Sequence, residues 1–554
     1  MSGQTISRLF DTRHLVAALN ERYRFFLAVA LAGAGTLAWL ARCVNDDAFI
    51  SFRYARNLAE GHGLVFNAGE RVEGYSNFLW TLLMAVPHVA GIDPVGFCFV
   101  AGPLLAALTL FFTSRAALAA TGSRPAALLV VALLALHPSF LAWATGGLET
   151  QFVTALLAAI VWLMLEAEPK NGPGIRRNVV LSLLAAAALM TRLDAAIIVG
   201  IALAAVAWRD WAARTVTHGC ALRLAALAGP LAALMIAWFC WKWLYYGELL
   251  PNTYQAKAGD GVIWPRGFAY LFIFFNSYLL WPFVLLIAFS AGRLVERAPL
   301  RAVPLLCMLG AHFAYLVHIG GDFMEFRMLV PILPVLYTLI AWSLFCRVAS
   351  VPLRAALVML LLAGALHHLV TFDTRRGIEA IARLTEHLHG PASDWVGVGR
   401  TLGRDLGSTD TLVAVTPAGA IPYYSRLPAL DMLGLTDRWV ARNGLPVLSQ
   451  PGHRRLAPYS YLVSEGVHLV VGHPWITPIP DPSRRSYRYS DLMRRGYLAD
   501  REPITFAPNV RVVEVPLDGK RALVALYLTS HPAIDALIAA GRWRAYPISA
   551  AGPP

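Results

Sequence analysis

Long apolar runs alternate with short polar connectors over the first two thirds of the chain. Runs of roughly 17 to 25 residues, the length that crosses a bilayer as a helix, begin near residues 25, 96, 125, 150, 179, 222, 266, 301, 328 and 352. The run over 179–208 is too long for one upright helix and carries the polar sequence TRLD at its centre, so we divide it into two helices. The pattern therefore predicts about eleven membrane crossings.

The segment 76–92 decides which loops share a side of the membrane. It is apolar but short, and it contains Pro87 and His88. If it lies in the outer interface, the arginine-bearing connectors fall on the side of the arginine-rich N-terminus, as the positive-inside rule expects; if it crosses, all of them are exported. We therefore predict that 76–92 is interfacial or re-entrant and that the N-terminus is cytoplasmic. The connectors are SRAALAATGSR, EPKNGPGIRRN, WRDWAARTVTHGCALR, AGRLVERAPLR and CRVASVPLR.

The pattern changes after about residue 371. Short β-branched runs bounded by Pro, Gly and Asp alternate there with helix-like stretches such as IEAIARLTEHL, which is typical of a small soluble α/β domain. An odd number of crossings places this region outside the cytoplasm. We therefore predict a transmembrane domain over 1–370 and an extracytoplasmic α/β domain over 371–554. The β-branched runs are TLVAVT, HLVVGH, VRVVEV and ALVALYLTS.

Composition supports a polytopic membrane protein. Hydrophobic residues make up 57% of the chain and charged residues 15%, and the mean hydropathy is +0.55. The net charge of +13 is spread over short groups between apolar runs, which does not indicate nucleic-acid binding. The first 24 residues are too long and polar for a signal-peptide n-region, so we expect the first helix to stay attached. The six cysteines lack metal-ligand spacing and are interpreted as packing residues.

The first predicted outer loop begins with an acidic pair, Asp46 and Asp47. The sequence predicts a helix from there until Gly61 and Gly63, with an apolar side for the membrane interface. Neighbouring residues on a helix differ by about 100° in direction, so the two carboxylates cannot point the same way. One could deprotonate or polarise an acceptor hydroxyl while the other orients it or caps the helix. Both could instead only stabilise the helix N-terminus.

Other polar groups fall in the same predicted set of outer loops. Each has a structural alternative: helix capping for a glutamate, a mutual ion pair for the arginine and aspartate of TRLD, and membrane-surface anchoring for the remaining cations. Five histidines in or beside the apolar runs show no metal-ligand spacing; they are His62, His88, His137, His312 and His318. The polar candidates are Glu149, Arg192, Asp194, Asn252, Tyr254, Lys257, Asp322, Glu325 and Arg327.

Acids and cations gathered at one membrane face fit two kinds of activity. An enzyme could bind a lipid-phosphate sugar, with cations on the phosphate and a carboxylate on the acceptor hydroxyl. A transporter or flippase of a lipid-linked sugar would place its ionisable groups near the midplane, often in two symmetric halves, and the distribution favours the enzyme. A purely structural scaffold does not account for the charges within TRLD.

Five motifs, in order, resemble the GT-C fold membrane glycosyltransferases, and most of all the terminal arabinofuranosyltransferases of the actinobacterial cell wall and their bacterial relatives. The resemblance covers about residues 40–345, and it extends more weakly to LDMLGLTD, AGAIPYYS and PGHRR in the tail. It implies a GT-C type helical membrane domain with an interfacial helix in the first outer loop, followed by the α/β domain. The motifs are DDAFISFRYARNLAEGHGLVFNAGERVEGYSNFLW, GGLETQF, TRLDA, YYGELLPNTYQAK and GGDFMEFRMLVPILP.

The resemblance implies a donor and an acceptor. The donor is a polyprenyl-phosphate sugar, expected to be decaprenyl-phosphoryl arabinofuranose, although relatives accept other lipid-linked pentoses and hexoses. The acceptor is a glycan or glycoprotein outside the bacterial cytoplasmic membrane. The family's essential aspartate pair matches Asp46 and Asp47. Relatives more often show TRPD where this chain has TRLD, which leaves the helix break at that point open.

These expectations assign roles to the candidates. Asp46 or Asp47 acts on the acceptor hydroxyl or on the charge that develops at the sugar, and Arg327, Lys257 and Arg192 are candidates for the donor phosphate. No cofactor is required, although a divalent ion held by Asp47 and Glu149 fits the residue types. The candidates for sugar hydroxyls and other substrate contacts are Glu149, Asp194, Asp322, Asn252 and Tyr254.

Overall fold

In a computed structural model, the chain divides into two compact units built from alternating segments. The helical unit comprises 1–43, 95–240 and 262–378, and the mixed unit comprises 44–94, 241–261 and 379–554. Two predicted outer loops, 44–94 and 241–261, therefore belong to the same unit as the C-terminal region, which the division at residue 370 does not anticipate. The structure describes residues 19–166, 174–212, 217–257, 263–447, 453–478 and 485–549.

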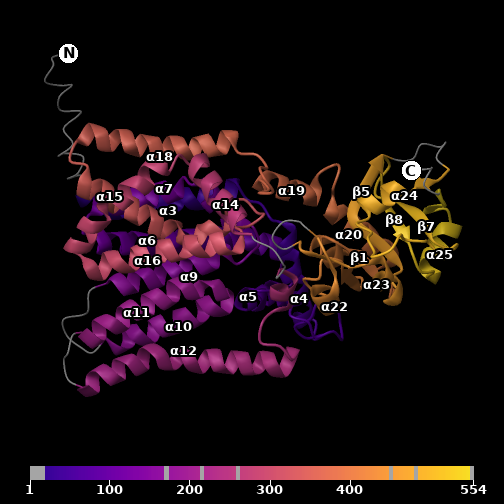
Figure 1. The fold of residues 1–554 in the computed structure, drawn as a ribbon, viewed down its shortest axis with the longest axis horizontal. Coiled ribbons are helices and arrows are strands. Elements are labelled where there is room, and N and C mark those ends of the chain that lie inside the picture. Colours follow the sequence, from indigo (N-terminus) through magenta and orange to yellow (C-terminus); the bar gives the residue numbers. More distant parts are fainter. Residues whose placement is uncertain are drawn as a thin grey trace, which may run out of the picture. The chain divides into compact units, whose positions relative to one another are not determined.

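The helical unit is a set of long apolar helices (Figure 1). Within the described residues, seven helices are long and apolar enough to cross a membrane, or nine if two bent pairs each count as one span. The sequence predicts about eleven crossings, and two of the predicted segments, α9 and α10, have only 16 and 17 residues. The helices are α3 (Tyr23–Leu40), α6 (Pro94–Thr121), α7 (Arg124–Ala135), α8 (Pro138–Thr145), α9 (Thr150–Leu165), α10 (Ile175–Thr191), α11 (Ala196–Ala212), α12 (Thr217–Tyr246), α14 (Trp264–Ser277), α15 (Trp281–Arg297), α16 (Pro299–Ile319), α17 (Leu333–Arg347) and α18 (Val351–Thr371).

Three of these helical segments are broken inside the unit. At TRLD, α10 ends at Thr191, and Arg192 is extended with φ −153° and ψ 125° before the short 3-10 helix η1 (Leu193–Ala195). The break therefore forms without the proline of the family motif. The pairs α7–α8 and α14–α15 bend by 62° and 103°. In the first bend His137 precedes Pro138, and a residue before proline is disfavoured in helical conformation.

A buried polar cluster joins the two bends to the loop before the 3-10 helix η2 (Arg327–Ile332). The ring of Tyr278, at the α14–α15 bend, stacks between His137 and His368, with centroids 4.1 and 4.3 Å away. Ser139 Oγ donates to Glu325 Oε1 over 3.0 Å, and His368 Nε2 lies 2.9 Å from the same oxygen. Because buried polar groups must find partners inside the protein, these contacts fix the loop against both bends.

The mixed unit contains a six-stranded sheet of order β2-β1-β5-β8-β7-β9. The first three strands run parallel, and β5, β8, β7 and β9 pair antiparallel. The predicted α/β character of the tail is thus confirmed. The strands of this sheet are β1 (Val413–Val415), β2 (Ala429–Asp431), β5 (Leu469–Pro478), β7 (Arg511–Pro516), β8 (Arg521–Tyr527) and β9 (Arg544–Tyr546), and two small sheets add β3 (Leu445–Pro446), β4 (Arg455–Leu456), β6 (Tyr487–Arg488) and β10 (Ile548–Ser549).

Short helices complete the mixed unit. The segment predicted to be interfacial forms α5 (Phe78–Val89), whose 12 residues are too few to span a bilayer. The others are α4 (Asp46–Ala59), α13 (Asn252–Lys257), α19 (Ile381–His389), α20 (Trp395–Leu406), α21 (Ala420–Ser425), α22 (Arg438–Asn443), α23 (Tyr459–Ser464), α24 (Tyr489–Arg495) and α25 (Pro532–Ala539).

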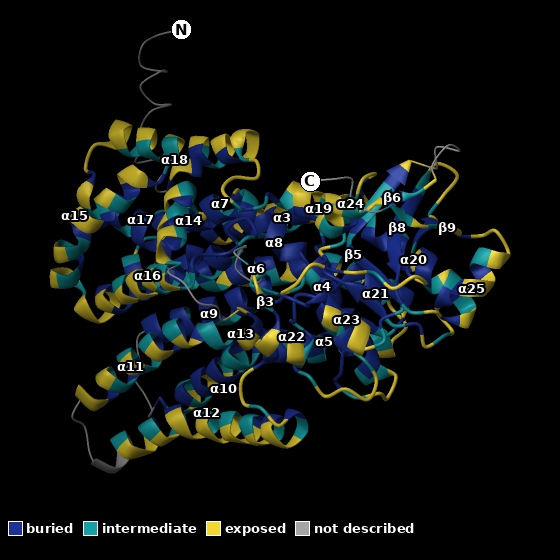
Figure 2. Cartoon of the chain, turned by 45° about the vertical axis from the view of Figure 1, so that its right-hand side comes forward, coloured by how far each residue is buried: buried dark blue, intermediate teal, exposed yellow. Residues whose placement is uncertain are grey.

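The helix α4 follows the predicted bounds but not the predicted surroundings. Asn45 caps it by accepting the N–H of Ala48 over 3.2 Å, and Gly61, with φ +84°, lies just past its end. Its apolar side was expected to face the membrane interface. Instead nearly all of α4 is buried (dark blue in Figure 2), and Phe49 packs against the rings of Tyr423 and Tyr424 of α21.

The packing of α18 on the α14–α15 bend gives a first prediction. A Cβ added at Gly364 would lie 2.1 Å from the carbonyl oxygen of Tyr278, whereas one added at Gly310 in α16 meets nothing within 4 Å. We expect Gly364→Ala to destabilise the protein by about 1–3 kcal/mol through overpacking. Gly310→Ala should leave stability unchanged or raise it by up to about 1 kcal/mol through helix propensity. Thermal unfolding of the purified protein in detergent measures both, and equal unfolding temperatures would contradict this packing.

Candidate active site

Asp46 binds the N-terminus of α21, a helix whose first residue lies 374 positions further along the chain. Its carboxylate accepts the N–H of Ala420 over 2.7 Å and that of Gly419 over 3.1 Å. The side chain is buried, and the burial raises the pKa of Asp46 to about 7, an effect that the two N–H donors oppose. The contact is tight, because a Cβ at Gly419 would lie 1.9 Å from the Asp46 carbonyl oxygen. Asp46 thus satisfies N–H groups that a helix start leaves unpaired.

Two arginines of α4 bind the other end of α21. Arg53 donates from Nη1 to the carbonyl of Pro422 over 2.5 Å and from Nη2 to that of Leu427 over 2.9 Å. Arg56 donates to the carbonyl of Tyr423 over 2.6 Å. An anion therefore faces the N-terminus of α21 and two cations face its C-terminus, the arrangement that a helix dipole favours. We name this set of contacts the α4–α21 clamp.

The clamp separates the roles of the acidic pair. Asp47 follows Asp46 on α4, points about 100° away from it, and is partly exposed where Asp46 is buried. Asp46 is therefore the aspartate that holds a partner element. The sequence predicts that one aspartate of the pair acts on the acceptor hydroxyl, and Asp47 is now the candidate for that role.

A buried ion pair anchors the rest of the first outer loop in the mixed unit. Lys242 Nζ lies 2.8 Å from Glu73 Oε2, and both side chains are almost completely buried. Burial raises the pKa of Glu73 to about 7, against the lowering effect of Lys242. The backbone carbonyl of Glu73 also accepts the N–H of Asn252. These contacts tie the sequence GERVEGYS to the end of α12 and the start of α13.

Asn252 makes hydrogen bonds inside the mixed unit, and its predicted sugar contact stays a prediction. Its Nδ2 donates to the carbonyls of Gly434, Leu435 and Asp437 over 2.9 to 3.1 Å, and the residue is 1% exposed. It therefore holds the LDMLGLTD loop. Tyr254 and Lys257, on the same helix α13, are exposed, so their predicted substrate roles remain predictions.

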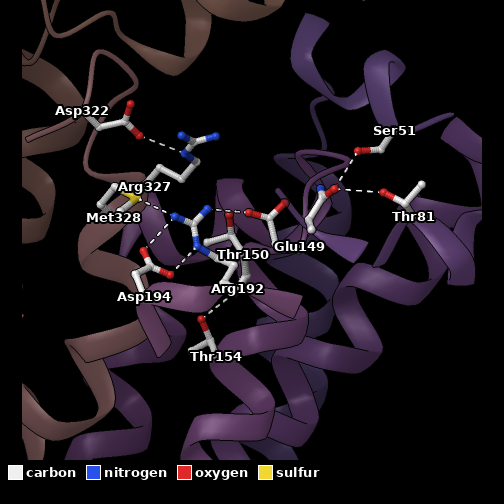
Figure 3. Close-up of polar contacts among 11 residues, drawn as sticks. Ser51, Thr81, Glu149, Thr150, Thr154, Arg192, Asp194, Asp322, Arg327 and Met328 are labelled. Carbon is white, nitrogen blue, oxygen red and sulfur yellow. Dashed lines mark hydrogen bonds and ion pairs between the residues drawn. The ribbon is translucent and has the colours of Figure 1, made fainter. Parts of the chain in front are cut away.

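In the helical unit, Arg192 lies between two carboxylates (Figure 3). Its Nε and Nη2 bind both oxygens of Asp194 over 2.9 and 2.8 Å, and Nη1 lies 2.6 Å from Glu149 Oε1. All three nitrogens thus bind carboxylates, two of them in the bidentate form that gives the strongest pairs. The break at TRLD makes this geometry possible, since Arg192 lies outside the helices on either side.

Arg327 forms a simpler ion pair in the same unit. Its Nε lies 2.9 Å from Asp322 Oδ2. The loop before it turns at Gly320 and Gly321, which have φ of +80° and +74°, so the glycines are needed for the irregular backbone that the sequence predicts. The residue before Arg327 is Phe326, at φ +44° and fully buried.

The two arginines line one small cavity. Its charged lining is Arg192, Arg327 and Asp194, its other polar lining includes Thr150 and His312, and Val153, Leu157, Ile198 and Pro331 are among its apolar lining. A cation beside an apolar wall suits an amphiphile with an anionic end. The two guanidinium groups are matched by three carboxylates, those of Glu149, Asp194 and Asp322, so the cluster carries a formal charge of about −1.

A metal site stays a prediction without structural support. Within the part of the chain that the structure describes, no group of three or more His, Cys, Asp or Glu side chains is arranged to hold a metal ion. The sequence prediction of a divalent ion on Asp47 and Glu149 names only two ligands.

Several residues of these contacts were not identified from the sequence. Lys242 carried the clearest signal, since it is a lysine inside the apolar run AWFCWKWLYY, and such residues usually have a buried partner. Arg53 and Arg56 are three residues apart on one helix and share a face with each other. Their partners in α21 could not be found by spacing, because they lie more than 360 residues away.

Comparison with known proteins agrees with this architecture. A family model described as "Domain of unknown function (DUF8728)" matches residues 383–516. The terminal β-(1→2)-arabinofuranosyltransferase of Mycobacterium tuberculosis is 31% identical over 355 residues, which cover 57% of this chain and 53% of that protein. The protein of the same name from Corynebacterium glutamicum is 30% identical over 359 residues, covering 55% and 49%. The chain thus spans about half the length of these curated relatives.

Solved structures establish the fold. ArnT from Cupriavidus metallidurans in the apo state aligns with a TM-score of 0.51 at 14% identity and covers 93% of this chain and 100% of that one. The same protein bound to undecaprenyl phosphate aligns with a TM-score of 0.50 at 14% identity, covering 90% and 97%. This chain is therefore a multi-pass membrane protein with the GT-C fold, as the sequence resemblance implies.

The bonds of Arg192 predict a strong effect on stability. Arg192→Gln leaves Glu149 and Asp194 buried without their cation, and breaking such a pair from one side costs about 3–5 kcal/mol. Adding Glu149→Gln to that variant should restore part of the lost stability, because one uncompensated charge is removed. The unfolding temperatures of parent, single and double variants in detergent measure the coupling. Additive effects would contradict the ion pair.

The burial of Asp46 predicts a pH dependence. Its pKa is about 7 in the folded chain against 3.8 ordinarily, so between these values the folded state binds more protons than the unfolded state. Stability contributed by this group therefore falls as the pH rises from about 4 to about 7. We expect Asp46→Asn to reduce the loss of unfolding temperature between pH 5 and pH 8. The pKa of Glu73 is also raised by burial, so the Asp46→Asn variant should still lose some unfolding temperature as the pH rises. If the variant loses as much unfolding temperature as the parent, Asp46 is not a buried, titrating group.

Proposed function

We propose that this protein is a membrane glycosyltransferase that moves a D-arabinofuranosyl group from a polyprenyl-phosphate donor to a hydroxyl of a glycan or glycoprotein outside the cytoplasmic membrane. The observation that carries the proposal is the α4–α21 clamp, which binds one member of the acidic pair and leaves the other in a partly exposed position. The fold of ArnT and the identity of about 30% to two terminal arabinofuranosyltransferases support it.

Asp47 is the proposed base. Its carboxylate takes the proton of the acceptor hydroxyl while that oxygen bonds to C1 of the donor sugar. The bond from C1 to the phosphate oxygen breaks, and its electron pair leaves with the polyprenyl phosphate. Asp46 is the proposed positioning residue, since both of its carboxylate oxygens accept N–H groups at the start of α21 and so fix α4 against that helix.

Arg327 is the proposed ligand of the donor phosphate. It lines the apolar cavity of the helical unit, and its ion pair with Asp322 is formed through Nε rather than in the bidentate form, so this pair is the easier one to exchange for a phosphate. Arg192 binds carboxylates with all three nitrogens, which favours a structural role. The structure of ArnT bound to undecaprenyl phosphate is consistent with a polyprenyl-phosphate ligand for a chain of this fold.

The proposed location is the bacterial inner membrane. With the N-terminus in the cytoplasm, the arginine-bearing connectors lie inside, as the positive-inside rule favours. Asp47 and the C-terminal region then lie outside the cytoplasm, where a polysaccharide or glycoprotein acceptor would be met.

A donor panel tests the activity. Purified protein is supplied with polyprenyl-phosphate arabinofuranose, a second pentose and a hexose, together with an acceptor oligosaccharide, and products are followed by mass spectrometry. We expect a new glycosidic product from the arabinofuranose donor. Consumption of another donor would show that the proposed donor sugar is wrong. Movement of labelled lipid across a vesicle bilayer without any glycosidic product would show that the protein is a transporter and not an enzyme.

Three variants test the roles. Asp47→Asn should lower kcat by about 10²- to 10⁴-fold, the range of general-base catalysis. Arg327→Gln should mainly raise the KM for the donor. Asp46→Asn should lose stability as well as activity, because it removes an acceptor for one of the two N–H groups. If Asp47→Asn matches the parent while folding normally, the assignment of the base fails.

A further inference from the structure

Three arginines gather where α10 begins, α11 ends and α12 begins, in the helical unit. Arg177 is in α10, Arg209 in α11 and Arg223 in α12. Arg209 Nη1 donates to the carbonyls of Met164 and Glu166 at the end of α9, whereas Arg177 and Arg223 are the members that contact Asp210 and Asn178. Asn178 links these helices: its Nδ2 lies 2.8 Å from Asp210 Oδ2 and 3.1 Å from the carbonyl of Arg223. The three helices lie side by side in Figures 1 and 2. We call this group the arginine cluster.

The hydrogen bonds of the cluster leave Arg223 uncompensated. Arg223 is 9% exposed, and its Nε and Nη2 are buried without a hydrogen-bond partner among the residues that the structure describes. Asp210 is a neighbouring carboxylate, but its Oδ2 accepts from Asn178 and its Oδ1 lies 3.7 Å from Arg177. A buried guanidinium group without an acceptor is costly, by several kcal/mol for a full charge. The site therefore fits an anion with oxygen acceptors.

Aromatic side chains mark the depth of the cluster in the membrane. Trp208 and Trp211 flank Arg209 and Asp210 on α11, are 59% and 58% exposed, and have ring centroids 5.2 Å apart. Exposed tryptophans at the end of an apolar helix are typical of the interface between hydrocarbon and headgroups. Leu222, beside Arg223, is also exposed. The cluster thus combines buried cations with apolar surface at the depth where phospholipid phosphates lie.

The helix α12 has little other support in the helical unit. Little of it is buried (Figure 2), and a second polar link to α10 is the 2.8 Å bond from the N–H of Leu231 to Ser182 Oγ. A ligand that bridges α10, α11 and α12 would add contacts where the chain makes few.

We propose that the phosphate group of an anionic phospholipid binds the arginine cluster and stabilises the attachment of α12. The positive charge of the arginines favours a phosphate group as the ligand. The exposed side chains of Trp208, Trp211 and Leu222 favour a lipid over a soluble anion, because they offer apolar surface beside the cations. This site is separate from the cavity lined by Arg192 and Arg327, and it does not depend on the proposed transferase activity.

Native mass spectrometry of the full-length protein in detergent tests the site. Phosphatidylglycerol and phosphatidylcholine are titrated against the parent and the variants Arg223→Gln, Arg223→Lys and Arg301→Gln. Arg301 is an exposed arginine of α16 and serves as the matched control. We expect the parent and Arg301→Gln to retain one tightly bound phosphatidylglycerol and to bind phosphatidylcholine at least tenfold more weakly. Arg223→Gln should lose at least tenfold in phosphatidylglycerol affinity, and Arg223→Lys should lose less.

A second measurement, the unfolding temperature with and without added lipid, tests the site even if the Arg223→Gln variant folds poorly. Phosphatidylglycerol should raise the unfolding temperature of the parent and of Arg327→Gln, whose substitution lies in the proposed donor site, while phosphatidylcholine should not. Equal retention of both lipids, or the same phosphatidylglycerol affinity in Arg223→Gln and parent, would overturn the proposal. So would an equal rise in unfolding temperature with millimolar inorganic phosphate in place of lipid, since the site would then accept a free anion.

Discussion

Buried charge that must be compensated within the chain determines which distant segments of this protein meet. In a low-dielectric interior an unpaired ion costs several kcal/mol, and a chain this apolar offers few polar groups to satisfy it. The structure solves the problem in two ways. Lys242 with Glu73 and Arg192 with Asp194 are matched by opposite charge. Asp46 is matched instead by backbone N–H groups at a helix end.

The contact between Asp46 and the backbone N–H groups of α21 joins the first outer loop and the C-terminal region in a single folding unit. The helix α21 has six residues, and isolated helices that short are unstable in water. It forms between an aspartate at its start and two arginines at its end, all supplied by α4. The dependence runs both ways, since nearly all of α4 is buried and the rings of Tyr423 and Tyr424 in α21 cover its Phe49. The tail therefore belongs to the framework that orients Asp47, in addition to any contact it makes with an acceptor.

Local physics in the sequence predicted much of this architecture. Length and apolarity identified the helical segments, the polar sequence TRLD located a break, and the 100° offset on a helix predicted that the two aspartates of the pair would point in different directions. Segment membership could not be obtained in this way. Residues 44–94 and 241–261 join the C-terminal region through contacts such as Asp46 with Ala420 and Asn252 with Gly434. Such contacts depend on which distant backbone groups approach, and residue spacing carries no information about that.

The same constraint separates the arginines by what they can bind. Arg53 and Arg56 are occupied by carbonyl groups, and Arg192 is held by two carboxylates, so none of them can turn toward a new anion without leaving a buried group unpaired. Around the cavity of the helical unit, the formal charge of about −1 opposes the proposed donor phosphate, which is itself anionic. Binding there requires an arginine whose ion pair can be exchanged at low cost. Arg327 meets this requirement best, because its ion pair with Asp322 is formed through Nε rather than in the bidentate form, and its loop is fixed from behind by the buried side chains of Glu325 and Phe326. A rigid backbone beneath an exchangeable ion pair lets the guanidinium change partners while the surrounding helices stay in place.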